Sequence, residues 1–109
     1  MKQILILSIL CILTASVAHG GEIFGSIKEN NKPVAKGIKI EIIAPKKAYT
    51  AETDSFGSYR VFVPEKGKCT FKFNYNKQTP SFDIFSYDKS TRYDFLIETV
   101  KDKYILRRK

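Results

Sequence analysis

The twelve residues TDSFGSYRVFVP, Thr53 to Pro64, decide the fold of this chain. They read as the end of one strand, a tight turn and a second strand with regular alternation. Asp54 and Gly57 specify the turn, because an aspartate side chain accepts nearby backbone N–H groups and glycine adopts positive φ without steric cost. The side chains after the turn alternate between two faces, as in a half-buried strand. We expect one face to point inward, with Tyr59, Val61 and Val63, and the other outward, with Ser58, Arg60 and Phe62.

Residues 1–20 have the pattern of an export signal. Lys2 gives a positive start, an apolar run follows, and small residues continue up to Gly20. We expect cleavage after Gly20, with Ala18 as the alternative position. The run is shorter than the ~20 apolar residues of a membrane-spanning helix, and no small residue directly precedes Cys11, which argues against a lipid-anchored cysteine. We therefore expect a secreted or periplasmic protein without a remaining transmembrane segment.

The rest of the chain, residues 21–109, has 89 residues (109 − 20) and suffices for one small domain. It keeps a single cysteine, Cys69, so it has no internal disulfide and its hydrophobic core must be sufficient alone. Its formal net charge is +7, which is the whole-chain value of +8 less Lys2. This excess favours anionic neighbours such as lipid headgroups or acidic polysaccharide. The simpler interpretation is a surface charge that serves solubility alone.

Segments with period-two alternation recur along this part of the chain, separated by Gly, Pro, Asn and Asp turns. The seven expected strands cover residues 22–28, 37–43, 49–53, 58–63, 68–75, 81–87 and 91–99. A short edge strand at 104–106 is a further candidate. Strands spaced about 8–12 residues apart, with no helical period after residue 20, indicate an all-β, seven-strand antiparallel sandwich. No repeat or linker divides the segment, so we expect one domain over residues 21–109.

Four segments carry a family resemblance: GSI at 25–27, NKPVAKGIKI at 31–40, TDSFGSYR at 53–60 and VPEKG at 63–67. Together they resemble the carboxypeptidase regulatory-like domain. That family has a first strand with Gly, a Pro-Val-x-x-Gly-Val-x-Val strand, a Thr-Asp-x-x-Gly-x-Tyr hairpin and a glycine turn. The resemblance is good from residue 22 to about 75 and loose in the last third. It implies a transthyretin-like (prealbumin-like) or immunoglobulin-like sandwich, a non-catalytic module found beside secreted enzymes, outer-membrane receptors and carbohydrate-binding proteins. It also implies a small bacterial envelope protein, and it transfers a fold but no active site.

The side chains offer little for catalysis. The only histidine, His19, lies in the export signal, so the exported chain has no imidazole for general-base or zinc chemistry. The segment after Asp54 does not fit a calcium loop, because Phe56 stands where an oxygen ligand is needed. Cys69 shares the inward phase of the neighbouring phenylalanines, which favours a buried, inert thiol over one activated by nearby lysines. We expect no enzyme, no cofactor and no metal site.

A binding role has to use the outward side chains. The outward set combines four aromatic rings with one arginine: Phe24, Arg60, Phe62, Phe85 and Tyr87. If this set shares a face with Lys28, Lys39 and Lys72, rings that stack on sugars lie beside cations that bind phosphate or carboxylate. The simpler alternative is that the face is covered, either by the C-terminal segment around Tyr104 and Leu106 or by a second copy of the chain.

Our preferred hypothesis is a non-catalytic, exported binding module that takes carbohydrate or an anionic envelope partner on a sheet face. The alternative is an accessory subunit of an envelope complex, which pairs an edge strand with a partner protein by strand addition. Neither hypothesis involves specific nucleic acid. The two differ in whether the outward rings form one exposed patch or are covered while an edge strand stays open.

Overall fold

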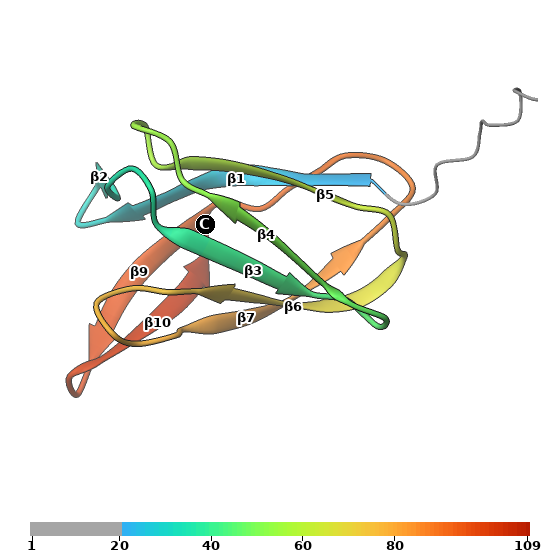
Figure 1. The fold of residues 1–109 in the computed structure, drawn as a ribbon. Coiled ribbons are helices and arrows are strands. Elements are labelled where there is room, and N and C mark those ends of the chain that lie inside the picture. The colour runs from blue at the N-terminus through green and yellow to red at the C-terminus, as the bar shows by residue number, and fades with distance from the viewer. Residues whose placement is uncertain (1–20) are drawn as a thin grey trace, which may run out of the picture.

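Two β-sheets that face each other form the structure of residues 21–109, the part of the chain that the computed structural model describes (Figure 1). The first sheet holds β1 (Gly21–Glu29), β2 (Lys32–Pro33), β5 (Ser58–Val63), β8 (Thr91–Arg92), β9 (Phe95–Val100) and β10 (Lys103–Arg108). The second sheet holds β3 (Lys39–Ile43), β4 (Ala48–Glu52), β6 (Gly67–Phe73) and β7 (Ser81–Ser86). The predicted all-β sandwich is therefore confirmed. The expected export signal, residues 1–20, lies outside the described residues, and within the described range no helix is long and apolar enough to cross a membrane.

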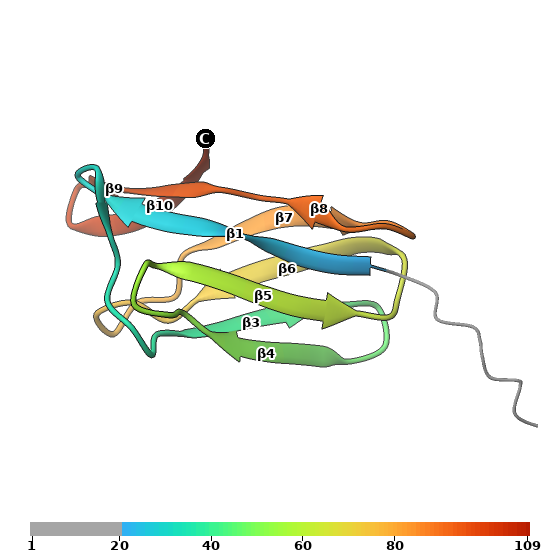
Figure 2. The same cartoon turned by 90° about the horizontal axis from the view of Figure 1, so that it is seen from above.

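The first sheet is mixed, which corrects the predicted antiparallel arrangement. β1 lies at its centre, antiparallel to β5 on one side and parallel to β8 and β9 on the other. Figure 2 shows β1 between β5 and the segment that contains β8 and β9. The chain reaches β8 from β7 in the second sheet, so no hairpin joins β8 to β1 and no reversal of direction is imposed. The second sheet, in the order β4-β3-β6-β7, is antiparallel throughout.

The described range contains ten strands rather than the predicted seven. One reason is that the predicted strand 91–99 is interrupted at Tyr93 and Asp94, which divides it into β8 and β9. The other reason is that two tight turns create additional hairpin strands. Alternation alone does not reveal such an interruption, because the inward and outward phases continue across it.

Two-residue turns with positive φ at both positions, as in type I′ turns, account for the other two additional strands, β2 and β10. Asn30 and Asn31 have φ of 53° and 64°, and this turn lets β2 pair with the end of β1. Lys101 and Asp102 have φ of 50° and 67°, and this turn joins β9 to β10. The predicted edge strand at 104–106 is therefore confirmed but longer, because all six residues of β10 pair with β9.

The core lies between the sheets and consists of the inward side chains of the alternating strands. Tyr59, Val61 and Val63 are all buried, as the alternation after the Asp54 turn predicts. The strands on either side of that turn, β4 and β5, lie in different sheets, so the turn connects the two sheets rather than closing a hairpin. Phe71 of the second sheet and Phe95 of the first meet in the middle, with ring centroids 4.6 Å apart. Ring pairs at such distances stabilise the sandwich beyond the burial of apolar surface alone.

Cys69 belongs to this core, as predicted. Its side chain faces inward and the residue is 2% exposed. Burial, and after it the negative charge of Glu65, raises the pKa of the thiol. The thiolate form is therefore disfavoured in the folded protein.

The structure confirms the predicted turn at Asp54, in which the aspartate side chain has a structural role. One carboxylate oxygen of Asp54 accepts hydrogen bonds from the backbone N–H groups of Phe56, at 2.8 Å, and of Ser58, at 2.9 Å. Gly57 has φ of 72°, a conformation that glycine adopts without steric cost. The turn thus fixes where β5 begins and which of its side chains face outward.

Candidate functional site

A row of three side chains crosses the outer face of the first sheet. Arg60 of β5 and Arg92 of β8 are the register partners of Phe24 in β1, one on each side. Their guanidinium carbons lie 5.4 Å and 5.6 Å from the centroid of the Phe24 ring, within cation–π range. We call these three residues the arginine–phenylalanine row. Phe24 has a cation beside it on each neighbouring strand. Its ring therefore serves mainly to position the two guanidinium groups, and less as a free surface on which a ligand could stack.

Each arginine of the row is held by a carboxylate. Arg60 forms an ion pair with Glu22 of β1, and Nε of Arg92 lies 2.8 Å from Oδ2 of Asp94. Both arginine side chains nevertheless remain exposed, at 66% and 60%. A guanidinium group has five N–H donors, so each arginine keeps donors for a ligand. The two cations are therefore held in place and still accessible.

Asp94 stands at the interruption between β8 and β9 and supplies a side-chain acceptor to the sheet. Its Oδ1 accepts hydrogen bonds from the backbone N–H of Ser26, at 2.9 Å, and from the Ser26 hydroxyl, at 3.3 Å. Burial opposes ionisation of this carboxyl, but the hydrogen bonds from Arg92 and Ser26 outweigh it, so the pKa of Asp94 lies below its ordinary value. Asp94 is therefore a charged anchor that connects the sheet to Arg92.

The close packing at this interruption depends on a glycine in β1. Tyr93 turns its carbonyl group toward Gly25, so that a Cβ at Gly25 would lie 1.9 Å from the carbonyl oxygen. The buried hydroxyl of Tyr59 donates a hydrogen bond to the same oxygen at 2.6 Å. These contacts fix Tyr93 and, with it, the two neighbours Arg92 and Asp94.

A cleft of about 410 Å³ lies beside the row. The polar cleft, as we call it, is lined chiefly by Phe24, Glu52, Asp54, Ser58, Arg60 and Arg92. Two arginines and two carboxylates balance in formal charge, so the cleft offers hydrogen-bond donors and acceptors without a net charge. Its volume falls within the range of about 300–1,000 Å³ that is usual for small-molecule sites. Within residues 21–109, no group of three or more His, Cys, Asp or Glu side chains is placed to hold a metal ion.

Phe62 belongs to the same face as the row. It follows Arg60 by two positions in β5, pairs in register with Glu22, and is 52% exposed. Three residues of the predicted binding face, Phe24, Arg60 and Phe62, are therefore brought together on the first sheet.

Phe85 and Tyr87 lie apart from that group, on the second sheet. Phe85 is in β7, Tyr87 follows directly after this strand, and their ring centroids are 6.2 Å apart with an interplanar angle of 22°. The two rings line a second cleft of about 420 Å³ together with Lys66 and Lys89. We call it the aromatic cleft. The predicted binding face is thus divided into two separate surfaces.

The lysines that we grouped with this set are divided as well. Lys28 is in β1 of the first sheet, whereas Lys39 and Lys72 are in β3 and β6 of the second. The C-terminal segment does not cover an outer face in the described structure, which corrects that part of the simpler alternative; cover by a second copy of the chain stays a prediction. It extends the first sheet as the edge strand β10, with Leu106 buried in the core and Tyr104 packed against it.

Sequence reasoning missed the parts of the site that depend on register. The pattern places Arg92 on an outward phase, but only the parallel pairing of β8 with β1 brings it beside Phe24. Glu52 and Asp54 join the cleft because the turn that leads from β4 in the second sheet to β5 in the first lies next to the row. No local signal marks these neighbours. Phe56, in the turn that follows Asp54, is 74% exposed. Its exposure, unlike the position of Arg92, is predictable from its place in a turn.

The fold places the chain among β-sandwich domains of known structure. No family model and no curated protein matches the sequence. A DUF3823 family protein from Parabacteroides merdae has a similar fold, with a TM-score of 0.57 and 9% identity over 84% of this chain and 60% of that one. A candidate carbohydrate-binding protein from Bacteroides uniformis gives a TM-score of 0.54 and 17% identity over 81% of this chain and 53% of that one. At these identities the likeness establishes the fold alone, and this chain matches only between half and two thirds of the length of either protein.

Proposed function

We propose that this protein is a non-catalytic, exported binding module of the carboxypeptidase regulatory-like kind, and that it holds a carbohydrate in the polar cleft. The observation that carries the proposal is the arginine–phenylalanine row beside Glu52 and Asp54. Arg60 and Arg92 supply fixed donors, and the two carboxylates supply acceptors within the same cleft.

Sugar hydroxyl groups both donate and accept hydrogen bonds, so they match a cleft that is lined by both donors and acceptors. The anchoring of Arg92 by Asp94 and of Arg60 by Glu22 reduces the side-chain freedom that binding would otherwise remove. Because the formal charges in the cleft balance, it suits a neutral saccharide better than a polyanion. The positive charge of the chain as a whole is not concentrated there.

Further support comes from outside the cleft. The sequence resembles a family of modules that occur beside carbohydrate-binding proteins and secreted enzymes, and residues 1–20 have the pattern of an export signal. One protein of similar fold is a candidate carbohydrate-binding protein. Fold alone does not imply function, so the polar cleft remains the basis of the proposal.

Calorimetric titration of residues 21–109 with neutral gluco-, manno- and xylo-oligosaccharides tests this function, with oligouronates as the acidic comparison. We expect binding to a neutral series that changes little with salt, since no net charge is neutralised. Arg92→Ala should weaken that binding by roughly 10- to 100-fold, the usual value of a hydrogen bond to a charged group. Arg107→Ala is the matched control, because Arg107 is equally exposed and is also paired with a carboxylate, Glu98, at 3.0 Å.

Two results would refute carbohydrate binding at the polar cleft. One is that none of these saccharides binds to the unmodified chain. The other is that Arg92→Ala and Arg107→Ala weaken binding equally. That result would mean that the ligand binds elsewhere or that the loss of binding comes from the change in net charge alone.

Edge-strand assembly is the second candidate function. β10 forms an edge of the first sheet, and its outward Ile105 is 41% exposed. Lys103, Arg107 and Arg108 lie along the same strand, however, and charged side chains on an edge oppose pairing with another chain. Light scattering tests this candidate: an oligomer of residues 21–109 that Ile105→Lys dissociates would favour assembly over the polar cleft.

A further inference from the structure

The aromatic cleft presents an apolar surface that the polar cleft does not involve. Phe85 and Tyr87 are 45% and 50% exposed, and their nearly parallel rings form one continuous patch. Exposed large apolar side chains that gather in this way commonly mark an interaction site. Tyr87 adds a hydroxyl group to an apolar ring, a combination that suits a boundary between apolar and aqueous surroundings.

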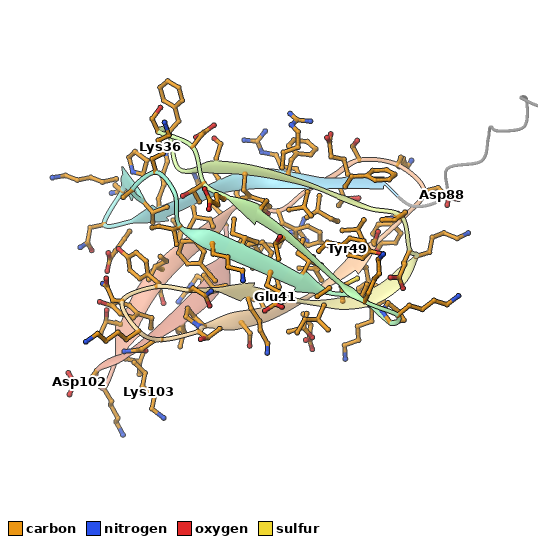
Figure 3. All side chains as sticks on the ribbon, in the orientation of Figure 1. Lys36, Glu41, Tyr49, Asp88, Asp102 and Lys103 are labelled. Carbon is orange, nitrogen blue, oxygen red and sulfur yellow. The ribbon has the colours of Figure 1, made fainter. Side chains whose placement is uncertain are left out.

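This patch lies at the end of the sandwich where β1 begins. A Cβ on Gly21 would lie 2.3 Å from the carbonyl oxygen of Lys89 and 3.0 Å from that of Tyr87, so the first described residue touches the β7–β8 loop. Figure 3 labels Asp88 at this end, next to the start of β1, and labels Lys36 and Lys103 at the opposite end. Cleavage after Gly20, as the sequence predicts, would add the α-ammonium group of Gly21 to the same surface.

The loops at this end carry an excess of positive charge. They are residues 44–47, 64–66 and 87–90, and the first two are joined by a hydrogen bond from the Lys46 N–H to Glu65 at 2.9 Å. Four lysines stand in these loops against two carboxylates: Lys46, Lys47, Lys66 and Lys89 against Glu65 and Asp88. Lys66 lies 3.5 Å from Asp88, but its side chain is still 58% exposed. The end therefore has a formal charge of +2 (4 − 2), before the α-ammonium group is counted.

We propose that this end of the molecule docks on an anionic lipid surface. Phe85 and Tyr87 enter the interfacial region, and the surrounding lysines face the phosphate groups. Aromatic residues are favoured at membrane interfaces, and lysines near an anionic surface each strengthen attraction to it. The occupant is a lipid surface rather than an acidic polysaccharide because these cations are exposed lysines around apolar rings. Lys66 has a carboxylate beside it, Asp88, and Lys47 has a ring beside it, Tyr49. Neither has both, as Arg60 and Arg92 do at the polar cleft.

Cosedimentation with vesicles tests this docking surface directly. The protein is residues 21–109, which include every strand of the sandwich, and the probes are phosphatidylcholine vesicles with and without phosphatidylglycerol. We expect pelleting with the mixed vesicles only, and a decrease as salt is raised. The double variant Lys66→Gln/Lys89→Gln should weaken partitioning by roughly 25-fold, about fivefold for each lysine.

The matched control is Lys36→Gln/Lys103→Gln, which removes the same charge from the opposite end (Figure 3). It should leave partitioning nearly unchanged. A third variant, Phe85→Ser/Tyr87→Ser, keeps the lysines and should lose the part of the binding that persists at high salt. Circular dichroism of each variant confirms that it is folded.

Three results would overturn the proposal. The first is no pelleting with phosphatidylglycerol vesicles at low salt. The second is an equal loss for the two lysine pairs, which would mean that net charge alone attracts the protein. The third is binding of a soluble polyuronate through Lys66 and Lys89 without vesicle binding. Arg92→Ala should not affect vesicle binding, so failure here and failure of the proposed carbohydrate site are distinguishable.

Discussion

Replacing Gly25 by alanine is the sharpest test of how the first sheet holds Arg92. The new Cβ would lie 1.9 Å from the carbonyl oxygen of Tyr93 and 2.6 Å from its carbon, both of them backbone atoms. Such atoms move only if the strand moves. Overpacking of this kind costs about 1–3 kcal/mol. The shift would also break the hydrogen bond from the buried Tyr59 hydroxyl, which contributes about 1 kcal/mol.

The two effects together predict a loss of about 2–4 kcal/mol in the free energy of unfolding. A chain of this size has on the order of 4–13 kcal/mol in total. Urea denaturation followed by circular dichroism measures the loss, and tyrosine fluorescence provides a second probe because the chain has no tryptophan. The thermal midpoint should fall by roughly 10–30 °C.

Gly37→Ala is the control that separates packing from backbone strain. A Cβ at Gly37 meets nothing within 4 Å, but φ there is 85°, so only the conformational cost of about 1–2 kcal/mol applies. The packing argument is wrong if Gly25→Ala costs no more than Gly37→Ala. Saccharide binding gives an independent readout, because movement of Tyr93 displaces Arg92 and should weaken any ligand of the polar cleft.

Three further predictions concern individual groups. Tyr59→Phe leaves the buried Tyr93 carbonyl without its hydrogen-bond donor and should lower the free energy of unfolding, measured by urea denaturation, by about 1–3 kcal/mol. Tyr49→Phe loses a more exposed hydrogen bond to Glu65 and should lower the free energy of unfolding by less. The pKa of Asp94 is lower in the folded chain than in the unfolded chain, where it is about 3.9. The ionised carboxylate therefore stabilises the fold fully above pH ~3.9, and this stabilisation is lost as the pH falls through the pKa of the folded chain. Denaturation curves at decreasing pH should show this loss, and Asp94→Asn should remove that part of the acid sensitivity. Cys69 should react with a thiol reagent only after denaturant is added, because the residue is buried and its pKa is raised; rapid stoichiometric labelling of the folded chain would contradict this.

The parts of the fold that local chemistry determines were predictable from the sequence. The predicted strand 58–63 coincides with β5, because the Asp54 turn before it and Pro64 after it both act within a few residues. The pair Asn30 and Asn31 likewise predicts a turn, since asparagine tolerates the left-handed conformation that both residues adopt.

The arrangement of the candidate site was not predictable in this way. Alternation separates inward from outward side chains, but a sandwich has two outer faces, and the pattern does not tell which face a residue joins. Phe24 and Phe85 therefore looked equivalent and lie on different sheets. Arg92 reaches Phe24 only through a parallel register between distant segments, and neither segment carries a local sign of it.

The central position of β1 also determines when the domain is able to fold. β1 comes first in the chain, but Asp94, which accepts a hydrogen bond from Ser26, lies 68 residues later. Contacts between such distant residues raise the contact order, and closing the long intervening loop slows folding. The first sheet stays incomplete until β8 and β9 have been synthesised. We therefore expect the chain to complete its fold only after most of it has been synthesised, and an unfolded chain is the state that passage through a narrow membrane channel requires.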